Sequence, residues 1–116
     1  MEQSLVDYKK AISDLGNDSS LYKELLDCWF SELPFDKNVL NAFIEKSELS
    51  EAASYVHRIK GAAGSLGALN LFQAAQKVED ILRGRSADAL TAHVKNLYDL
   101  YDRTNAEFRE LQNSIG

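Results

Sequence analysis

Apolar residues recur at helical spacing through almost the whole chain, and this regularity constrains the fold more than any other feature of the sequence. In the first segment, Leu5, Tyr8, Ile12 and Leu15 follow one another at steps of three, four and three residues, which places them on one face of a helix. The last segment carries one long apolar seam, formed by Leu90, Val94, Leu97, Tyr101, Phe108, Leu111 and Ile115. No stretch shows the alternation typical of a strand, so the sequence predicts an all-α fold.

Capping and breaking residues divide the pattern into six helical segments. Asp18 or Ser19 can cap the second helix, and Pro34 stops that helix at or before Leu33. The later boundaries fall at serines and glycines, in chain order Ser47 to Ser50, Gly67, Gly84 and Ser86. Of these, Gly84 is expected to end the fifth helix and Ser86 to cap the sixth. Thr104 interrupts the last apolar seam, so a bend can occur there.

The length and the short connections predict a compact bundle. A chain of 116 residues suits one domain with its own core, and short links between amphipathic helices favour antiparallel packing. We expect an antiparallel four-helix bundle from about residue 36 to the end, with the first two, shorter helices packed across one end. Residues 1–116 would then form a single domain, with N-terminal helices in 1–34 and the bundle in 35–116.

Charge, hydropathy and cysteine content exclude several classes of protein. A net charge of −5, a pI near 5.0 and the lack of a basic stripe argue against nucleic-acid binding and polybasic membrane contact. No apolar run approaches the ~20 residues of a membrane span, and the N-terminus has no signal-peptide core. Cys28 is the only cysteine and is expected to be a small buried apolar residue. We therefore expect a cytoplasmic protein.

His57 lies outside the apolar stripe of its own helix. At about 100° per residue, the core stripe is formed by Ala52, Val56, Ile59, Ala63 and Leu66. His57 points about 140° from the centre of that stripe, where a core histidine would not be found. The residues that share its direction are small, namely Ala53, Gly61, Gly64 and Ala68, with Arg58 and Lys60 on the flanks. This strip predicts a docking surface with an exposed imidazole at its centre.

Lys60 and the fifth helix give the histidine charged neighbours. Lys60 follows His57 by three residues and lies on the same side of the helix, where its ammonium favours a neutral, nucleophilic ring and can pair with an anion. A chain reversal near Gly67 places Glu79 at about the height of His57, with Gln76 one turn away. A carboxylate or amide there can hold one ring nitrogen and leave the other free to react. The alternative for Glu79 is a solvated helix charge.

The stretch "HRIKGAAGSLGA" at residues 57–68, followed by "VED" at 78–80, resembles the histidine-containing phosphotransfer (HPt) domain of multistep two-component signalling. The family pattern is a histidine, any residue, an aliphatic residue, Lys-Gly, small residues, a glycine about ten residues after the histidine, and an aliphatic-Glu pair on the next helix. The matching elements here are His57, Ile59, Lys60, Gly61, the stretch from Ala62 to Ser65, Gly67, and Val78-Glu79. Val56 departs from the alanine that often precedes the histidine.

The resemblance implies that His57 is the phosphoacceptor, at Nε2, with Lys60 neutralising the phosphoryl group and Gly61 giving the partner access. Glu79 or Gln76 would orient Nδ1. The family transfers the phosphoryl group reversibly between this histidine and receiver-domain aspartates, and the receiver supplies Mg²⁺ and the catalytic groups. We thus expect a monomeric phosphocarrier and not an autonomous enzyme, without a cofactor or metal site of its own. Its partners would be response-regulator receiver domains and a hybrid sensor histidine kinase.

Two other interpretations stay open. A helical adaptor could dock receiver or kinase domains with His57 incidental, or the chain could be the phosphoacceptor domain of a larger histidine kinase, although the initial Met and complete helical outline favour a free-standing protein. A carboxylate-bridged metal site is disfavoured, because Ser54 and Leu90 stand where Glu-x-x-His pairs would need glutamate. His93 has no following Lys-Gly and no small residues around it, so an edge or surface position is expected.

Overall fold

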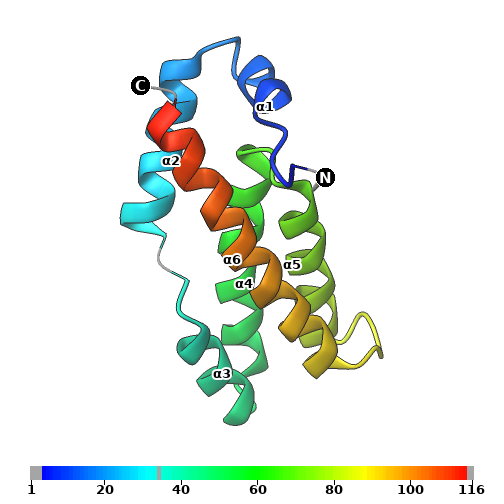
Figure 1. Cartoon of the computed structure of the whole chain (residues 1–116). Coiled ribbons are helices and arrows are strands. Elements are labelled where there is room, and N and C mark those ends of the chain that lie inside the picture. Colours follow the sequence, from blue (N-terminus) through cyan, green and yellow to red (C-terminus); the bar gives the residue numbers. More distant parts are fainter. Residues whose placement is uncertain (1–3, 34, 115–116) are drawn as a thin grey trace.

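The computed structural model describes residues 4–33 and 35–114. These residues contain six helices and no strand: α1 (Tyr8–Asp14), α2 (Ser19–Glu32), α3 (Lys37–Glu45), α4 (Leu49–Ser65), α5 (Leu69–Leu82) and α6 (Leu90–Ser114) (Figure 1). The predicted all-α fold is therefore confirmed. Pro34, which was expected to stop the second helix, lies outside the described residues, and α2 ends at Glu32.

Aspartates begin the first three helices by accepting hydrogen bonds from backbone N–H groups that have no partner within the helix. Asp7 accepts from Lys10 N, Asp18 from Leu21 N at 3.0 Å, and Asp36 from Asn38 N at 2.8 Å. Of the two caps proposed for the second helix, Asp18 is thus the one that forms. At the other end of the chain, the predicted cap Ser86 is wrong, because α6 begins four residues later at Leu90. Ser86 Oγ instead accepts from Asp88 N within the loop.

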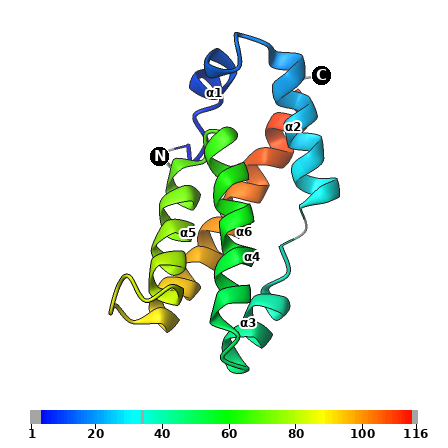
Figure 2. The same ribbon diagram turned by 180° about the vertical axis from the view of Figure 1, so that it is seen from behind.

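Helices α4 and α5 form an antiparallel hairpin, and α6 packs against α5 (Figures 1 and 2). In Figure 2, α4 lies on the near face and α6 crosses behind it. The turn between α4 and α5 passes through Gly67, whose φ of +84° suits glycine. A Cβ at this position would lie 2.5 Å from Asp7 O, because the N-terminal segment crosses the turn and donates Asp7 N to Gly67 O at 2.9 Å.

The position of α2 differs from the expectation that both N-terminal helices pack across one end. Only α1 lies there, whereas α2 runs beside the C-terminal half of α6 (Figure 1). Trp29 packs edge-on against Phe108 with centroids 5.0 Å apart, and its Nε1 donates to Asn105 Oδ1 at 2.7 Å. The apolar stripe of α2 is wide and includes Tyr22, Leu26 and Trp29. Burying these side chains requires a packing partner along the whole length of α2.

The buried side chains form one cluster to which all six helices contribute. On α4 the buried face consists of Ala52, Ala53, Val56, Ile59 and Ala63, which contains the predicted stripe. The stripe residue Leu66, just beyond the helix, is also buried. His57 is exposed. Helix α6 is continuous through Thr104, which is itself fully buried. The division of the domain at residue 34 stays a prediction.

Candidate functional site

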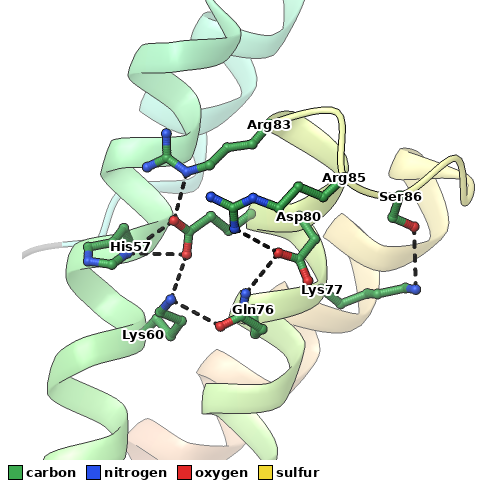
Figure 3. Close-up of polar contacts among 9 residues, drawn as sticks. His57, Lys60, Gln76, Lys77, Asp80, Arg83, Arg85 and Ser86 are labelled. Atoms are coloured by element: carbon green, nitrogen blue, oxygen red, sulfur yellow. Dashed lines mark hydrogen bonds and ion pairs between the residues drawn. The ribbon is translucent and has the colours of Figure 1, made fainter.

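The antiparallel hairpin brings His57 of α4 opposite Glu79 of α5, and Figure 3 shows the polar contacts around His57. His57 Nδ1 lies 3.1 Å from Glu79 Oε2 and 3.2 Å from Oε1. An ionised carboxylate only accepts hydrogen bonds, so Nδ1 carries the proton and Nε2 of the neutral ring has a free lone pair. The histidine side chain is 58% exposed, whereas the glutamate side chain is 3% exposed. The ring is thus fixed at one nitrogen by a buried group while most of it faces solvent.

The Glu79 carboxylate has two cationic partners besides the imidazole. Lys60 Nζ lies 2.8 Å from Oε1, and Arg83 Nε donates to Oε2 at 2.8 Å. Burial alone would raise the pKa of this carboxyl, but hydrogen bonds from Lys60, Arg83 and His57 outweigh it and lower the pKa to about 2. Glu79 therefore stays ionised at neutral pH, because direct cationic partners compensate its buried charge.

A second row of contacts links Lys60 to the loop after α5. Lys60 Nζ donates to Gln76 Oε1 at 3.0 Å, Gln76 Nε2 donates to Asp80 Oδ1 at 2.9 Å, and Arg85 Nη1 donates to the same Asp80 oxygen at 3.1 Å (Figure 3). Gln76 therefore contacts Lys60 and not the imidazole. Of the two residues proposed to hold Nδ1, the structure places only Glu79 there. The Lys60 side chain is only 14% exposed, because it reaches toward α5.

The predicted strip of small residues is not one exposed surface. Ala53 and Ala68 are fully buried, so their assignment to a docking surface is wrong. A Cβ on Gly64 would lie 3.1 Å from the Phe72 ring, which shows that α5 packs closely on this side of α4. Gly61 differs from Gly64, because it is exposed and a Cβ there would meet no described atom within 4 Å. Arg58 is also exposed.

The ion pair between Arg83 and Glu79 was not predicted from the sequence. Arg83 Nε bonds to the same carboxylate oxygen, Oε2, that approaches His57 Nδ1. The spacing of Glu79 and Arg83, four residues apart on the predicted fifth helix, is the signal that could have identified it. The two cationic partners of Glu79 thus come from α4 and from the residue that directly follows α5.

Other candidate groups show no comparable arrangement. His93 of α6 is half-buried beside Lys77 and Asn96 in a shallow groove between α5 and α6. Burial, followed by the nearby carboxylates of Glu32 and Asp27, raises the pKa of the half-buried Cys28 thiol. In the described ranges, no group of three or more histidine, cysteine or acidic side chains could hold a metal ion. None of the described helices is both long and apolar enough to span a bilayer.

Comparison with known families agrees with the geometry of this site. The family model of the Hpt domain matches residues 24–113, which is most of the chain. No curated protein and no solved structure matches the chain significantly. Hpt domains carry out histidine phosphotransfer in two-component signalling, act as phosphocarriers rather than classical enzymes, and interact with receiver domains and histidine kinases. With a family match over more than half its length, the chain belongs to the Hpt domain family.

Proposed function

We propose that His57 accepts a phosphoryl group from the aspartate of a receiver domain and passes it to another receiver. The observation that carries this proposal is the contact of Nδ1 with the buried, ionised Glu79 on an otherwise exposed ring. The nucleophile is then Nε2, and no proton has to leave it before attack. Family membership supports the histidine chemistry, and the contact of Nδ1 with Glu79 supports Nε2 as the reacting atom.

The proposed transfer exchanges one bond to phosphorus for another. The Nε2 lone pair forms a bond to phosphorus while the phosphorus–oxygen bond to the aspartate breaks, and the electron pair of that bond returns to the aspartate carboxylate. The ring becomes a phosphorylated imidazolium that keeps its proton on Nδ1. Glu79 stabilises this cation through the contact at 3.1 Å. The same cation is a good leaving group, so transfer to a second receiver runs the step backwards.

The surrounding residues have distinct parts in this proposal. Lys60 balances the negative charge that a phosphoryl group brings, about −1.5 to −2 if it ionises like other phosphorylated side chains. Gly61 leaves open space beside the ring for the partner. Glu79 is a positioning residue, because it acts through the imidazole. The receiver would supply Mg²⁺ and orient its aspartate, so the rate gain comes from proximity.

The partners and setting follow the same proposal. A hybrid sensor histidine kinase would supply phosphoryl groups through its receiver domain, and response-regulator receivers would take them. The protein would act as a monomer in the cytoplasm.

The test is phosphotransfer from a panel of labelled, phosphorylated receiver domains to the wild type, His57→Gln and His93→Gln. The second variant is a matched control, since His93 is the other histidine of the chain. We expect acid-labile, base-stable label on the wild type and on His93→Gln, with none on His57→Gln. Acid-labile label on His57→Gln would show that the acceptor is wrong. An adaptor would bind receivers equally well in all three forms without taking label.

A further inference from the structure

Arg58 is an exposed arginine directly beside the acceptor histidine, and among the described residues it has no hydrogen-bond or ion-pair partner. The other arginines are all engaged: Arg83, Arg85 and Arg103 with carboxylates, and Arg109 with Gln112 and the Phe30 ring. A guanidinium offers a planar fork of donors suited to a carboxylate. All the hydrogen-bond donors of the Arg58 guanidinium are therefore available to another molecule.

The surroundings of His57 are cationic on an acidic chain. Lys60 and Arg83 share one carboxylate, that of Glu79, and the exposed Arg58 adds a third cation on α4, whereas the whole chain has a formal net charge of −5. A local excess of one sign attracts a partner surface of the opposite sign and steers its approach. The partner that fits this site therefore carries carboxylates where it meets His57.

A groove of about 410 Å³ lies next to Arg58, and its lining residues come from α3 and the N-terminal half of α4. It is lined by Phe43, Ser50, Glu51, Ser54, Tyr55 and Arg58. Its aromatic part is held from behind, because Tyr55 stacks on Phe35 with centroids 5.4 Å apart and its hydroxyl accepts from Asp36 N at 2.8 Å. The groove is thus a preformed surface that contains two aromatic side chains, Phe43 and Tyr55.

The groove carries opposite charges at its two ends, Glu51 at one and Arg58 at the other. Glu51 and Arg58 lie seven residues apart on α4, which corresponds to about 10 Å along the helix axis. The basic end adjoins His57 and the acidic end points away from it along α4. A partner segment can therefore match this pattern in only one orientation.

We infer that this α3–α4 groove determines which receiver domains dock, and in which orientation. It takes a receiver segment that carries a carboxylate nearest the phosphorylated aspartate, then an apolar side chain, then a cationic side chain. The carboxylate pairs with Arg58, the apolar side chain covers Phe43 and Tyr55, and the cation faces Glu51. This inference rests on the proposed function, because it names the surface by which the same receivers are chosen.

The test compares Arg58→Glu with Lys95→Glu, an equal change of charge at an exposed position of α6, the helix that lies behind α4 in Figure 2. The receiver domain that labels the wild type fastest is titrated against each protein. Uptake from phosphoramidate, a small donor without a docking surface, is measured in parallel. We expect Arg58→Glu to raise the KM for the receiver at least about tenfold with a much smaller change in kcat, and Lys95→Glu to keep the KM within about twofold. Glu51→Lys should also raise the KM.

Each contrary outcome has a separate meaning. Equal KM values for Arg58→Glu and the wild type would overturn the groove as a docking surface, and so would equal increases for Arg58→Glu and Lys95→Glu. A loss with phosphoramidate as large as the loss with the receiver would overturn it too, because Arg58 would then act on the reaction at His57. If the wild type took label from no receiver, the proposed function itself would fail.

Discussion

Glu79 is a buried residue of α5 that binds the imidazole and two cationic side chains at once. Its carboxylate binds His57, Lys60 and Arg83 while the residue is 2% exposed. A buried charge of this kind is tolerated because its partners are close, and removing it leaves the partners uncompensated. The Glu79 carboxylate therefore both orients the His57 ring and stabilises the hairpin of α4 and α5.

Glu79→Gln is expected to lower the free energy of unfolding by about 3 kcal/mol, because Lys60 and Arg83 lose their buried counter-charge. The exposed Glu110→Gln on α6 is the control and should change it by less than about 0.5 kcal/mol. The folded-state pKa of the Glu79 carboxyl, about 2, lies below its ordinary value of 4.5. The stabilisation is therefore complete above pH 4.5 and declines as the pH falls toward 2.

Urea unfolding of the wild type and Glu79→Gln at several pH values between neutral and acidic measures both effects. The difference between the two proteins should shrink as the pH drops below 4.5. A difference that stayed constant into acid would contradict the low pKa of this carboxyl.

Thr104 is a polar side chain in the core, and within the described part of the chain its Oγ1 has no hydrogen-bond partner. Leaving a buried hydroxyl unsatisfied costs about 1–3 kcal/mol. Valine has the same shape without the hydroxyl, so Thr104→Val should raise the free energy of unfolding by about 1 kcal/mol. The exposed Thr91→Val on the same helix is the matched control. Thermal unfolding measures both, and a lower melting temperature for Thr104→Val would show that the hydroxyl has a partner.

At the scale of elements, the turn between α4 and α5 sets the register that places Glu79 opposite His57. Gly67 and Gly84 both have positive φ, at +84° and +78°. Alanine at either site would lower the free energy of unfolding by about 1–2 kcal/mol, because that backbone conformation is unfavourable for a residue with a Cβ. At Gly67 a Cβ would also meet Asp7 O at 2.5 Å, whereas at Gly84 no described atom lies within 4 Å.

Gly67→Ala should therefore destabilise the protein by about 1–3 kcal/mol more than Gly84→Ala. Chemical denaturation of the two variants gives the difference directly. Equal losses would mean that the N-terminal segment does not hold the turn as the structure shows it.

The spacing of apolar residues and turn signals was sufficient to predict the helices and the buried stripe of α4. It also predicted that His57 and Glu79 lie at the same height of the helical hairpin. These depend on spacing along one helix or across one short turn. The same projection could not show which side of α4 would meet α5. Ala53 and Ala68, which the projection placed on an exposed strip, are fully buried in the folded chain.

At the scale of the whole molecule, the sequence could not place α2, because its apolar stripe fits any apolar surface of similar length. The structure places it on α6, where Trp29 contacts Tyr101 and Phe108. The buried residues consequently form one cluster that includes the N-terminal helices.

A single cluster predicts that the chain unfolds in one cooperative transition. Trp29 is the only tryptophan, so its fluorescence reports on the packing of α2 against α6, while circular dichroism in the far ultraviolet reports on all helices. The two signals should change at the same urea concentration. An earlier fluorescence transition would instead support a separate unit before residue 35.

We propose that Glu79 holds Nδ1 of His57, so that Nε2 takes the phosphoryl group. Nuclear magnetic resonance of the protein with ¹⁵N-labelled histidine, before and after phosphorylation by a receiver, tests this at the atom concerned. We expect phosphorus coupled to Nε2 of His57, with the proton kept on Nδ1. Phosphorus on Nδ1, or on either nitrogen of His93, would contradict it.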